Sequence, residues 1–326
     1  MAMKRALAGF FLLTALYVGA LVWIDARRQV FDGLIALAGV LPVLMAVSLV
    51  TYAVRFARWR WLLARAGHVT PVGRGWLAYL SGFAFTATPG KVGELIRIRY
   101  HQPMGVPASR VIAAFVFERA FDLIAVLGLA ALSIRDSRLM SLALVFVVLC
   151  LVVVTLPARF PSLMDRMRAW LDRRHLPRAA SLCAVLGEAF LGCRIWLTPV
   201  DLAISAGLGL VAWGATALAF SHLLGRLGVT GLTGGDALAM YPMAMLAGAA
   251  SMLPGGIGST EAALVALLTT SGVGLAVAVL AAVGIRLATL WFAIVCGLIA
   301  AFGLELRSQT TLARSASPTT RREDAA

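Results

Sequence analysis

Two short motifs in the chain join a Pro-Gly pair to a glutamate, and an arginine follows each of them inside an apolar stretch. The motifs are Pro-Gly-Lys-Val-Gly-Glu at 89–94 and Pro-Gly-Gly-Ile-Gly-Ser-Thr-Glu at 254–261. Arg119 lies 25 residues after the glutamate that ends the first motif, and Arg286 lies 25 residues after the glutamate that ends the second. An isolated charge at the centre of a bilayer costs about 2.5–3.5 kcal/mol on insertion scales, so such residues pair or face water. The equal spacing indicates two equivalent Glu–Arg pairs.

The backbone of both motifs is suited to binding an anion. Glycine and proline end the helix, and irregular backbone at membrane depth is tolerated only where protein or a watery cavity surrounds it. A half-helix that starts near Gly93 or Ser259 presents unpaired N–H groups and the positive end of its dipole, a seat for a lipid phosphate. A tight contact between helices, which small residues permit, is the alternative. The binding loops are expected to consist of Pro89, Gly90, Gly93, Pro254, Gly255, Gly256, Gly258, Ser259 and Thr260.

Charged side chains on and near the motifs are the candidate contacts of a bound headgroup. An arginine fork suits phosphate oxygens, and Lys91, Arg97 and Arg99 surround the first hairpin. The three could equally be ordinary basic residues of a cytoplasmic loop. The candidate headgroup-binding residues are Lys91, Glu94, Arg97, Glu118, Arg119, Asp122, Glu261 and Arg286.

These charges are also expected to pair with one another. Asp122 is three positions from Arg119 and four from Glu118, which allows pairing along one helix face. Arg286 has no charged neighbour in its own apolar stretch, so Glu261 is its natural partner. The glutamate of the first motif with Arg119 is the equivalent pair. Structural salt bridges and substrate contacts remain open as interpretations, and an ion pair exchanged for a phosphate would be a gate.

The composition is that of an integral membrane protein. Of the 326 residues 61% are apolar and 13% are charged, and the mean hydropathy is +0.90. A soluble domain carries about 25% charge. The four cysteines form no CxxC pair and the four histidines are scattered, so we expect no metal, cofactor or redox site. The net charge of +14 is explained by basic cytoplasmic loops rather than by nucleic acid.

The expected fold is all-α, with about six full transmembrane helices and two re-entrant or broken hairpins. A span needs about 20 apolar residues. The stretches at 76–88 and 237–272 are interrupted at the Pro-Gly motifs and form the hairpins. The six full spans are expected at 6–24, 34–54, 109–133, 139–156, 200–224 and 275–303.

Basic residues predict the topology. Arg55, Arg58 and their neighbours up to Arg74 follow the second span, and more arginines crowd 157–198, so both segments are expected in the cytoplasm with the two termini. An even number of crossings then separates them, which makes the first hairpin return to the cytoplasm. The second returns to the outside. Hairpins of opposite orientation indicate an inverted repeat, about 76–133 and 237–303, as many transporters have.

The domain organisation is expected to be simple. Residues 1–306 form a single transmembrane domain, and 157–198 is its basic cytoplasmic loop. Apolar and basic positions alternate at helical spacing over 162–178, which predicts an amphipathic helix on the inner leaflet, with a solvated linker as the alternative. Residues 307–326 are expected to be a disordered basic cytoplasmic tail.

Four segments together resemble a known family. They are RFARWRWLL at 55–63, TPGKVGE at 88–94, ERAFD at 118–122 and PGGIGSTE at 254–261. The chain is similar, over roughly 6–304, to the lysylphosphatidylglycerol synthase transmembrane-region family of flippase-like membrane proteins. The resemblance implies a bacterial inner-membrane protein that moves lipids with polar headgroups between leaflets. The soluble aminoacyl-transferring domain of some members is not expected here, so lysyl transfer is not either.

The sequence leaves three alternative functions. Membrane lipids are the expected partners. The first is translocation of a lipid with a polar, phosphate-containing headgroup, such as an aminoacyl-phospholipid, a polyisoprenyl-phosphate or a hopanoid-type lipid. The second is an intramembrane lipid-modifying enzyme, which is disfavoured because the sequence has no DxD or HxxxH pattern. The third is a secondary transporter of a soluble anion. No P-loop is present, so no ATP hydrolysis of that kind is expected. A homo-oligomer stays open.

Overall fold

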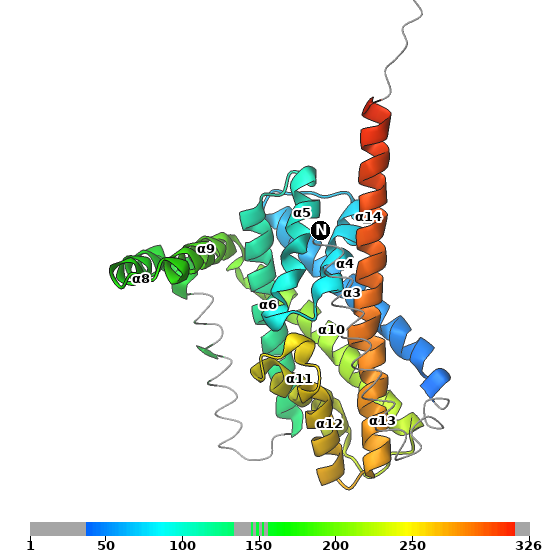
Figure 1. The fold of residues 1–326 in the computed structure, drawn as a ribbon. Helices are drawn as coiled ribbons and strands as arrows, with labels where there is room; N and C mark the ends of the chain where they lie inside the picture. The colour runs from blue at the N-terminus through cyan, green and yellow to red at the C-terminus, as the bar shows by residue number, and fades with distance from the viewer. Residues whose placement is uncertain (1–36, 134–144, 146–147, 150–151, 153–155, 317–326) are drawn as a thin grey trace, which may run out of the picture.

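The regular elements that the structure describes are all helices, which confirms the all-α prediction. The computed structural model describes residues 37–133 and 156–316, together with 145, 148, 149 and 152. Its helices pack into a bundle from which one helical hairpin projects sideways (Figure 1). The expected span at 6–24 lies outside the described residues, as does most of the one at 139–156.

Four of the described helices are long and apolar enough to cross a membrane, so the total of six stays a prediction. The expected span at 109–133 forms a continuous helix, α6 (Ala108–Ala130), but three charged residues lie at its centre. The four helices that meet both conditions are Leu41–Arg65, Pro177–Trp196, Pro199–Arg226 and Leu275–Arg307.

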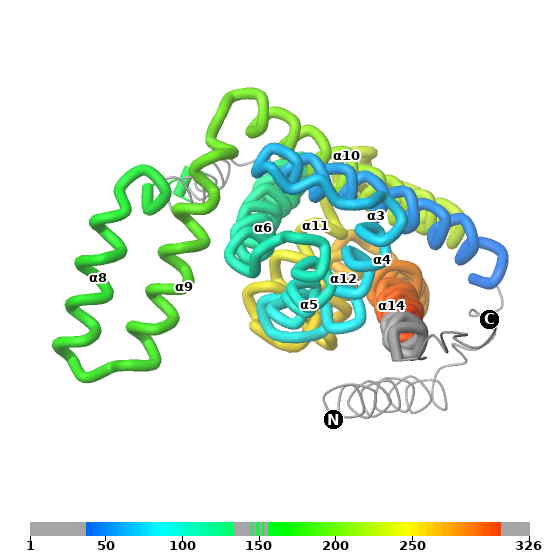
Figure 2. The backbone as a smooth tube through the Cα atoms, turned by 90° about the horizontal axis from the view of Figure 1, so that it is seen from above, coloured from blue at the N-terminus to red at the C-terminus, as the bar shows by residue number. Residues whose placement is uncertain are grey.

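Two long helices, α3 (Leu41–Arg65) and α10 (Pro199–Arg226), lie side by side (Figure 2). The predicted end of the second span at residue 54 is wrong, because α3 continues to Arg65. Arg55 and Arg58, expected in a cytoplasmic loop, point into the bundle and form ion pairs with Asp122 of α6. Carboxylates inside the bundle neutralise these charges, so the helix does not end there.

The first interrupted stretch is a hairpin of short helices. The chain reverses direction at residues 86–88, so that the segments before and after this turn lie side by side. The elements in order are α4 (Val72–Ser81), a 3₁₀ turn (Gly82–Phe85), a second 3₁₀ segment (Pro89–Ile96), α5 (Arg97–His101) and a last 3₁₀ turn (Gln102–Met104).

The second interrupted stretch is a hairpin of two longer helices. α11 (Gly234–Ala250) and α12 (Ser259–Thr270) flank a short 3₁₀ turn (Pro254–Gly256). In Figure 1 the first hairpin occupies the upper part of the bundle and α12 the lower part, so the two hairpins enter from opposite ends. Their turns touch, since a Cβ added at Gly255 would lie 3.2 Å from the Cα of Ala87.

After the second hairpin the chain forms a continuous series of helical turns that packs beside the turns of both hairpins. α13 (Leu275–Arg286) passes through a π-helical turn (Leu287–Trp291) into α14 (Phe292–Ala316). Single π-turns inside longer helices are frequent at functional sites. Here the π-turn places Thr289 beside the two hairpin turns.

The apolar core has two halves. One half packs α11, α12 and α13 against α10 around Phe220 and Leu264. The other packs α4 and α6 against α3 around Trp59 and Phe117. The residues of the candidate site come from both halves, which ties the two hairpins into one unit.

The basic segment at 157–198 forms a helical hairpin instead of a loop with one amphipathic helix. α8 (Pro161–Arg173) and α9 (Pro177–Cys193) run alongside one another, and α9 packs on α6. The helix predicted at 162–178 therefore ends at Arg173, because Pro177 begins the next helix. Both helices lie transverse to α14 (Figures 1 and 2), and Trp170 is 53% exposed on α8.

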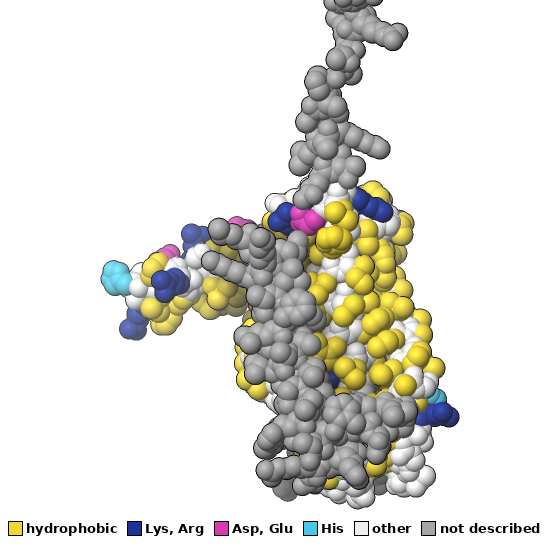
Figure 3. Space-filling view, turned by 45° about the vertical axis from the view of Figure 1, so that its right-hand side comes forward, with side chains coloured by type: hydrophobic (Ala, Val, Ile, Leu, Met, Phe, Trp, Pro, Cys, Tyr) yellow, Lys and Arg dark blue, Asp and Glu magenta, His cyan; other side chains and the backbone are white. Residues whose placement is uncertain are grey.

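The surface of the bundle is apolar between its ends. Figure 3 shows hydrophobic side chains over most of the visible face, with charged side chains near the top, near the lower edge and on the projecting hairpin. Ile299 and Phe302 of α14 are 67% and 64% exposed. Large exposed apolar surfaces of this kind suit lipid contact.

Gly297 lets α14 pack directly on the first hairpin, and its replacement tests this contact. A Cβ at Gly297 would lie 2.7 Å from the carbonyl carbon of Phe83 and would also overlap the backbone of Ala84. We expect Gly297→Ala to lower the free energy of unfolding in detergent by about 1–3 kcal/mol, because overpacking forces the two elements apart.

Gly303 provides the matched control in the same helix. A Cβ there meets nothing within 4 Å, and alanine favours a helix by about 1 kcal/mol over glycine. Gly303→Ala is expected to keep or raise the stability. Equal stability of the two variants would contradict the close contact at Gly297.

Candidate functional site

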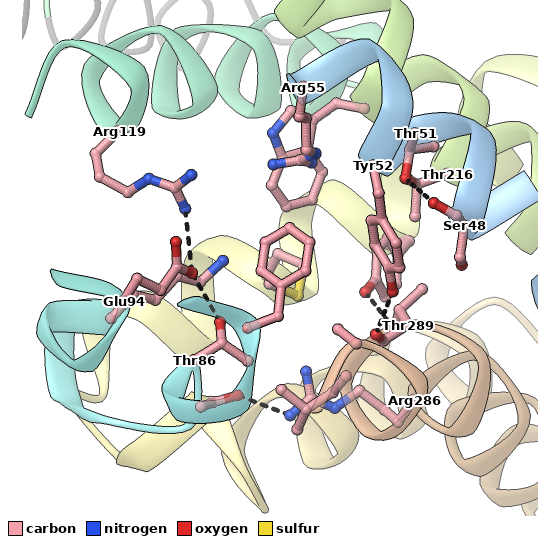
Figure 4. Close-up of a pocket in the computed structure, with 18 residues that line it drawn as sticks. Ser48, Thr51, Tyr52, Arg55, Thr86, Glu94, Arg119, Thr216, Arg286 and Thr289 are labelled. Atoms are coloured by element: carbon pink, nitrogen blue, oxygen red, sulfur yellow. Dashed lines mark hydrogen bonds and ion pairs between the residues drawn. The ribbon is translucent and has the colours of Figure 1, made fainter. Parts of the chain in front are cut away.

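A polar cavity lies where the two hairpin turns meet α3, α6 and the π-turn (Figure 4). It encloses about 700 Å³ of space, its open mouth included. Lys91 and Glu94 reach it from the first hairpin, and Gly255 reaches it from the second. Arg55 of α3, Arg119 of α6 and Arg286 of α13 complete the charged part of its described lining.

A network of buried ion pairs forms one side of this cavity. Arg58 and Glu118 are fully buried, and Arg58 Nη2 lies 3.2 Å from Glu118 Oε1 and 2.6 Å from Asp122 Oδ1. Asp122 Oδ2 also lies 2.9 Å from Arg55 Nη1 and 3.1 Å from Arg119 Nη2. The predicted pairing of Arg119 with Asp122 along α6 is confirmed, and α3 supplies partners that the spacing on α6 does not reveal.

Arg97 ties the first hairpin to this network. Its Nη2 lies 2.9 Å from Glu94 Oε2 and its Nη1 lies 3.4 Å from Glu118 Oε2. Its Nε donates a 2.9 Å hydrogen bond to the carbonyl of Tyr79, whose hydroxyl donates to Glu118. Arg97 does not line the cavity, and its contact with Glu94 holds that carboxylate in position.

The two Glu–Arg pairs predicted from the spacing both occur. Arg286 Nε lies 2.8 Å from Glu261 Oε1, and Arg286 Nη2 donates a 2.7 Å hydrogen bond to the carbonyl of Gly255. Arg119 Nη1 lies 3.9 Å from Glu94 Oε1. The second pair therefore holds the turn of its hairpin closely, while the first is a long contact that a competing anion can displace.

The turns of the two hairpins also share a backbone conformation. Gly90 and Lys91 have φ of 61° and 57°, and Gly255 and Gly256 both have φ of 63°. Lysine in this left-handed region is unusual, because its Cβ crowds the backbone at a cost of about 1–2 kcal/mol. Strain of this kind concentrates at functional sites, and here it holds the Lys91 side chain at the cavity.

The ends of the half-helices are less open to an anion than the sequence predicts. The N–H of Gly93 donates to Thr88 Oγ1 at 2.7 Å, and the N–H of Gly258 donates to Glu261 Oε2 at 2.9 Å. These two N–H groups, which lie at the predicted phosphate seats, are satisfied by the motifs themselves.

A second, mostly apolar cavity adjoins the first. It holds about 1060 Å³ of space, again including its mouth. Leu123 and Val126 of α6 line one side, and Met245 and Leu246 of α11 line the other. Met252, which also lines this cavity, is 65% exposed. The cavity thus connects the charged region with the apolar surface of the bundle.

Five residues line both cavities, and three of them carry hydrogen-bond donors without a partner among the described residues. The five are Lys91, Arg119, Trp213, Met245 and Gly255. Trp213 is 7% exposed, and its indole Nε1 has no hydrogen-bond partner within the described chain. The same holds for Arg119 Nε. For the Lys91 ammonium the structure gives no hydrogen bond or ion pair in the parts it describes. Three donors thus meet at the junction of a charged and an apolar cavity.

Among the residues that the structure describes, the charges around this junction do not balance. Five basic side chains, Arg55, Arg58, Lys91, Arg97 and Arg119, surround three carboxylates, Glu94, Glu118 and Asp122. The Glu261–Arg286 pair adds no net charge. Uncompensated buried charge is costly, so an anion at the junction would stabilise the site.

The predicted site residues divide into three groups. Lys91, Glu94, Arg119, Arg286 and Gly255 line the polar cavity, and Gly90, Asp122, Gly256 and Thr260 line the apolar one. The others hold these in place without lining either cavity: Arg97, Glu118, Glu261, Pro89, Gly93, Pro254, Gly258 and Ser259.

Sequence reasoning missed the contributions of α3 and α10. Arg55 and Trp213 line the polar cavity, as do hydroxyl groups such as that of Thr216. Arg55 falls in a run of basic residues that is typical of a cytoplasmic loop. Trp213 and Thr216 lie in an unbroken apolar stretch that predicts only a membrane span. The basic-aromatic segment at 55–63 was the one signal that could have placed Arg55 at the site.

Comparison with protein families and with curated proteins gave one match and one negative result. A family model described as the lysylphosphatidylglycerol synthase TM region matches residues 6–297. No curated protein matches the chain. The matched range contains both hairpins and every residue that lines the two cavities.

Replacing Arg58 tests whether the buried network holds the bundle together. Arg58 lines neither cavity, so its removal leaves the cavities' own side chains in place. We expect Arg58→Leu to lower the free energy of unfolding in detergent by about 3–5 kcal/mol, because it leaves Glu118 and Asp122 short of a buried partner.

An exposed ion pair serves as the control. Arg99, whose side chain is 63% exposed, contacts Glu305 at 2.9 Å. Arg99→Gln is expected to change the stability by about 1 kcal/mol or less. A small effect of Arg58→Leu, comparable with that of Arg99→Gln, would show that the network is not what secures α3 to α6.

Proposed function

The chain belongs to the lysylphosphatidylglycerol synthase TM-region family, and from this premise we propose that it moves a lipid with a phosphate-containing headgroup between the two leaflets of a membrane. The phosphate sits at the junction of the two cavities. The rest of the headgroup occupies the polar cavity, and the lipid tail occupies the apolar one and the membrane beyond it. The protein performs no chemical step on the lipid.

One observation carries the proposal: a polar, cation-rich cavity and an apolar cavity share Lys91, Arg119 and Trp213. A phospholipid has the same sequence of parts, with a polar headgroup, a phosphate and an apolar tail. Charge-assisted hydrogen bonds from lysine and arginine to phosphate oxygens are among the strongest in proteins. The donors at the junction thus match the one lipid group that carries a fixed negative charge.

The long Glu94–Arg119 contact supports a gating role for this ion pair. Arg119 also lies 3.3 Å from Glu118 and 3.1 Å from Asp122, so it has other partners when it leaves Glu94. A phosphate that takes the place of Glu94 would loosen the first hairpin from α6. The second hairpin stays tied to Arg286 through two contacts of 2.8 and 2.7 Å.

Movement of the hairpins would expose the junction alternately to the two sides. The hairpins enter from opposite ends of the bundle and touch at their turns, as expected for an inverted repeat. In this proposal the first hairpin opens toward the cytoplasm and the second toward the outside. Both termini lie in the cytoplasm, and the membrane is the inner membrane of a bacterium.

Transport of a soluble anion would use the same cations but not the apolar cavity. The apolar lining by Leu123, Val126, Met245 and Leu246, together with the exposed Met252, favours a lipid. A soluble anion needs a closed aqueous path instead. The two functions predict different results in reconstituted vesicles. A transporter of a soluble anion would take that anion up, whereas a lipid transporter would redistribute lipid between the leaflets.

Vesicle reconstitution tests the proposal. The purified protein is inserted into vesicles that carry phosphatidylglycerol labelled on one acyl chain, and the exchange between leaflets is followed by quenching of the outer label. Wild-type protein is expected to accelerate the exchange. Lys91→Asn removes the ammonium but keeps a residue that tolerates the left-handed conformation, and we expect it to slow the exchange roughly tenfold through loss of a charge-assisted hydrogen bond.

Two further variants sharpen the result. Trp213→Phe removes the indole N–H together with the five-membered ring but keeps an aromatic side chain, and it is expected to slow the exchange about fivefold, mainly through loss of one neutral hydrogen bond. Arg99→Gln, remote from both cavities, is expected to behave like the wild type. Uptake of inorganic phosphate without any exchange of lipid would refute lipid transport and favour the soluble anion.

A further inference from the structure

We infer that the transported lipid has an anionic, hydroxylated headgroup without a free amine; this inference rests on the proposed function. It follows from the wall of the polar cavity that lies opposite the charged junction. Neutral acceptor oxygens cover this wall, whereas every nearby carboxylate already has basic partners.

Hydroxyl groups from four helical elements form this wall. Figure 4 shows Ser48, Thr51, Tyr52, Thr216 and Thr289 on the side of the cavity away from Glu94. Tyr241, from the second hairpin, also lines the cavity, and its hydroxyl lies 3.1 Å from Thr289 Oγ1.

The protons of these hydroxyls are used within the protein. Ser48 donates to the carbonyl of Ala288 at 2.7 Å, and Thr51 donates to that of Ser48 at 2.8 Å. Tyr52 donates to the carbonyl of Thr289 at 3.1 Å, and Thr216 to that of Ala212 at 3.0 Å.

Thr289 completes the pattern. Its hydroxyl donates to the carbonyl of Ile285 at 2.7 Å, so in the contact with Tyr241 the tyrosine is the donor. A hydroxyl that donates its single proton keeps lone pairs that accept. The wall therefore offers uncharged acceptors, which suit the O–H donors of a glycerol, sugar or cyclitol headgroup.

An ammonium group would find no free carboxylate among the described residues of the polar cavity. Glu94 already accepts a 2.9 Å hydrogen bond from Thr86 and has Arg97 at 2.9 Å. Glu261 holds Arg286 and the N–H of Gly258. One aromatic face of Trp213, which could bind a cation, is occupied by the Arg55 guanidinium at 4.8 Å from the ring centroid.

The cations of the cavity would also repel an amine directly. Arg55, Lys91, Arg119 and Arg286 line the cavity, against Glu94 as the one carboxylate among its described lining residues. Inside a protein such repulsion is only weakly screened. A lysylated or ethanolamine headgroup places its amine among these cations, whereas a hydroxylated headgroup does not.

A panel of four lipids in the same vesicle assay tests this inference. Phosphatidylglycerol has hydroxyls and no amine, phosphatidylethanolamine has an amine, and lysyl-phosphatidylglycerol has two amines. N-acetyl-phosphatidylethanolamine is anionic with neither an amine nor a hydroxyl. We expect phosphatidylglycerol to exchange at least about tenfold faster than either amine-bearing lipid, which corresponds to 1.4 kcal/mol or more. The N-acetylated lipid is expected to lie between.

A variant that gains transport of an amine-bearing lipid distinguishes a change in headgroup preference from a general loss of transport activity. Thr216→Asp places a new carboxylate on the hydroxyl wall. We expect it to raise the exchange of phosphatidylethanolamine relative to phosphatidylglycerol at least about fivefold, since the amine then has a counter-ion. The matched control is Thr216→Asn, which has the shape of aspartate without the charge; its ratio of phosphatidylethanolamine to phosphatidylglycerol exchange is expected to stay well below that of Thr216→Asp.

The outcomes distinguish this inference from the function on which it rests. Exchange of an amine-bearing lipid at a rate equal to or above that of phosphatidylglycerol would overturn the inference and leave lipid transport standing. Equal rates for phosphatidylglycerol and the N-acetylated lipid would overturn the role of the hydroxyl wall. Exchange of none of the four lipids would overturn both the inference and the proposed function.

Discussion

The architecture of the site depends on an imbalance of charge inside an apolar bundle. Five basic side chains surround three carboxylates where α3, α6 and the first hairpin meet. The carboxylates hold the arginines in place, since each of Glu118 and Asp122 contacts more than one of them. The surplus cannot be neutralised from within this cluster. In the proposed function a lipid phosphate supplies the missing negative charge, and the apolar cavity beside the cluster holds the lipid tail.

The fold of the two hairpins places this charged cluster at the point where the helical structure is interrupted. Gly255 and Ala87 touch because glycine at 255 leaves room for the opposite turn. Each turn is secured by its own arginine, but at different distances, 2.8 Å for Glu261–Arg286 and 3.9 Å for Glu94–Arg119. In the proposed function this difference gives the two halves different roles: the second hairpin stays fixed, and Arg119 exchanges Glu94 of the first hairpin for a phosphate.

The sequence predicts the parts of this site that rest on local rules. The Pro-Gly breaks, the equal spacing of glutamate and arginine, and the apolar spans around them follow from helix breaking and from the cost of charge in a bilayer. The rule that basic residues follow a span misplaces Arg55 and Arg58, because it takes no account of carboxylates on another helix. Trp213 belongs to the site only through packing of α10 against α3, which no local pattern encodes. Helix ends that are capped by Thr88 and Glu261 likewise require the folded turn.

A distance between lipid phosphorus and Lys91 tests the central claim most directly. The sequence contains two lysines, Lys4 and Lys91, so Lys4→Arg protein labelled with ¹⁵Nζ-lysine carries a single side-chain label. In bilayers of phosphatidylglycerol, solid-state NMR then measures the dipolar coupling of this nitrogen to ³¹P. The account predicts a coupling that corresponds to about 3.5–4.5 Å, as for an ammonium hydrogen-bonded to a phosphate oxygen. A Lys91 nitrogen without measurable coupling to any lipid phosphorus would contradict it.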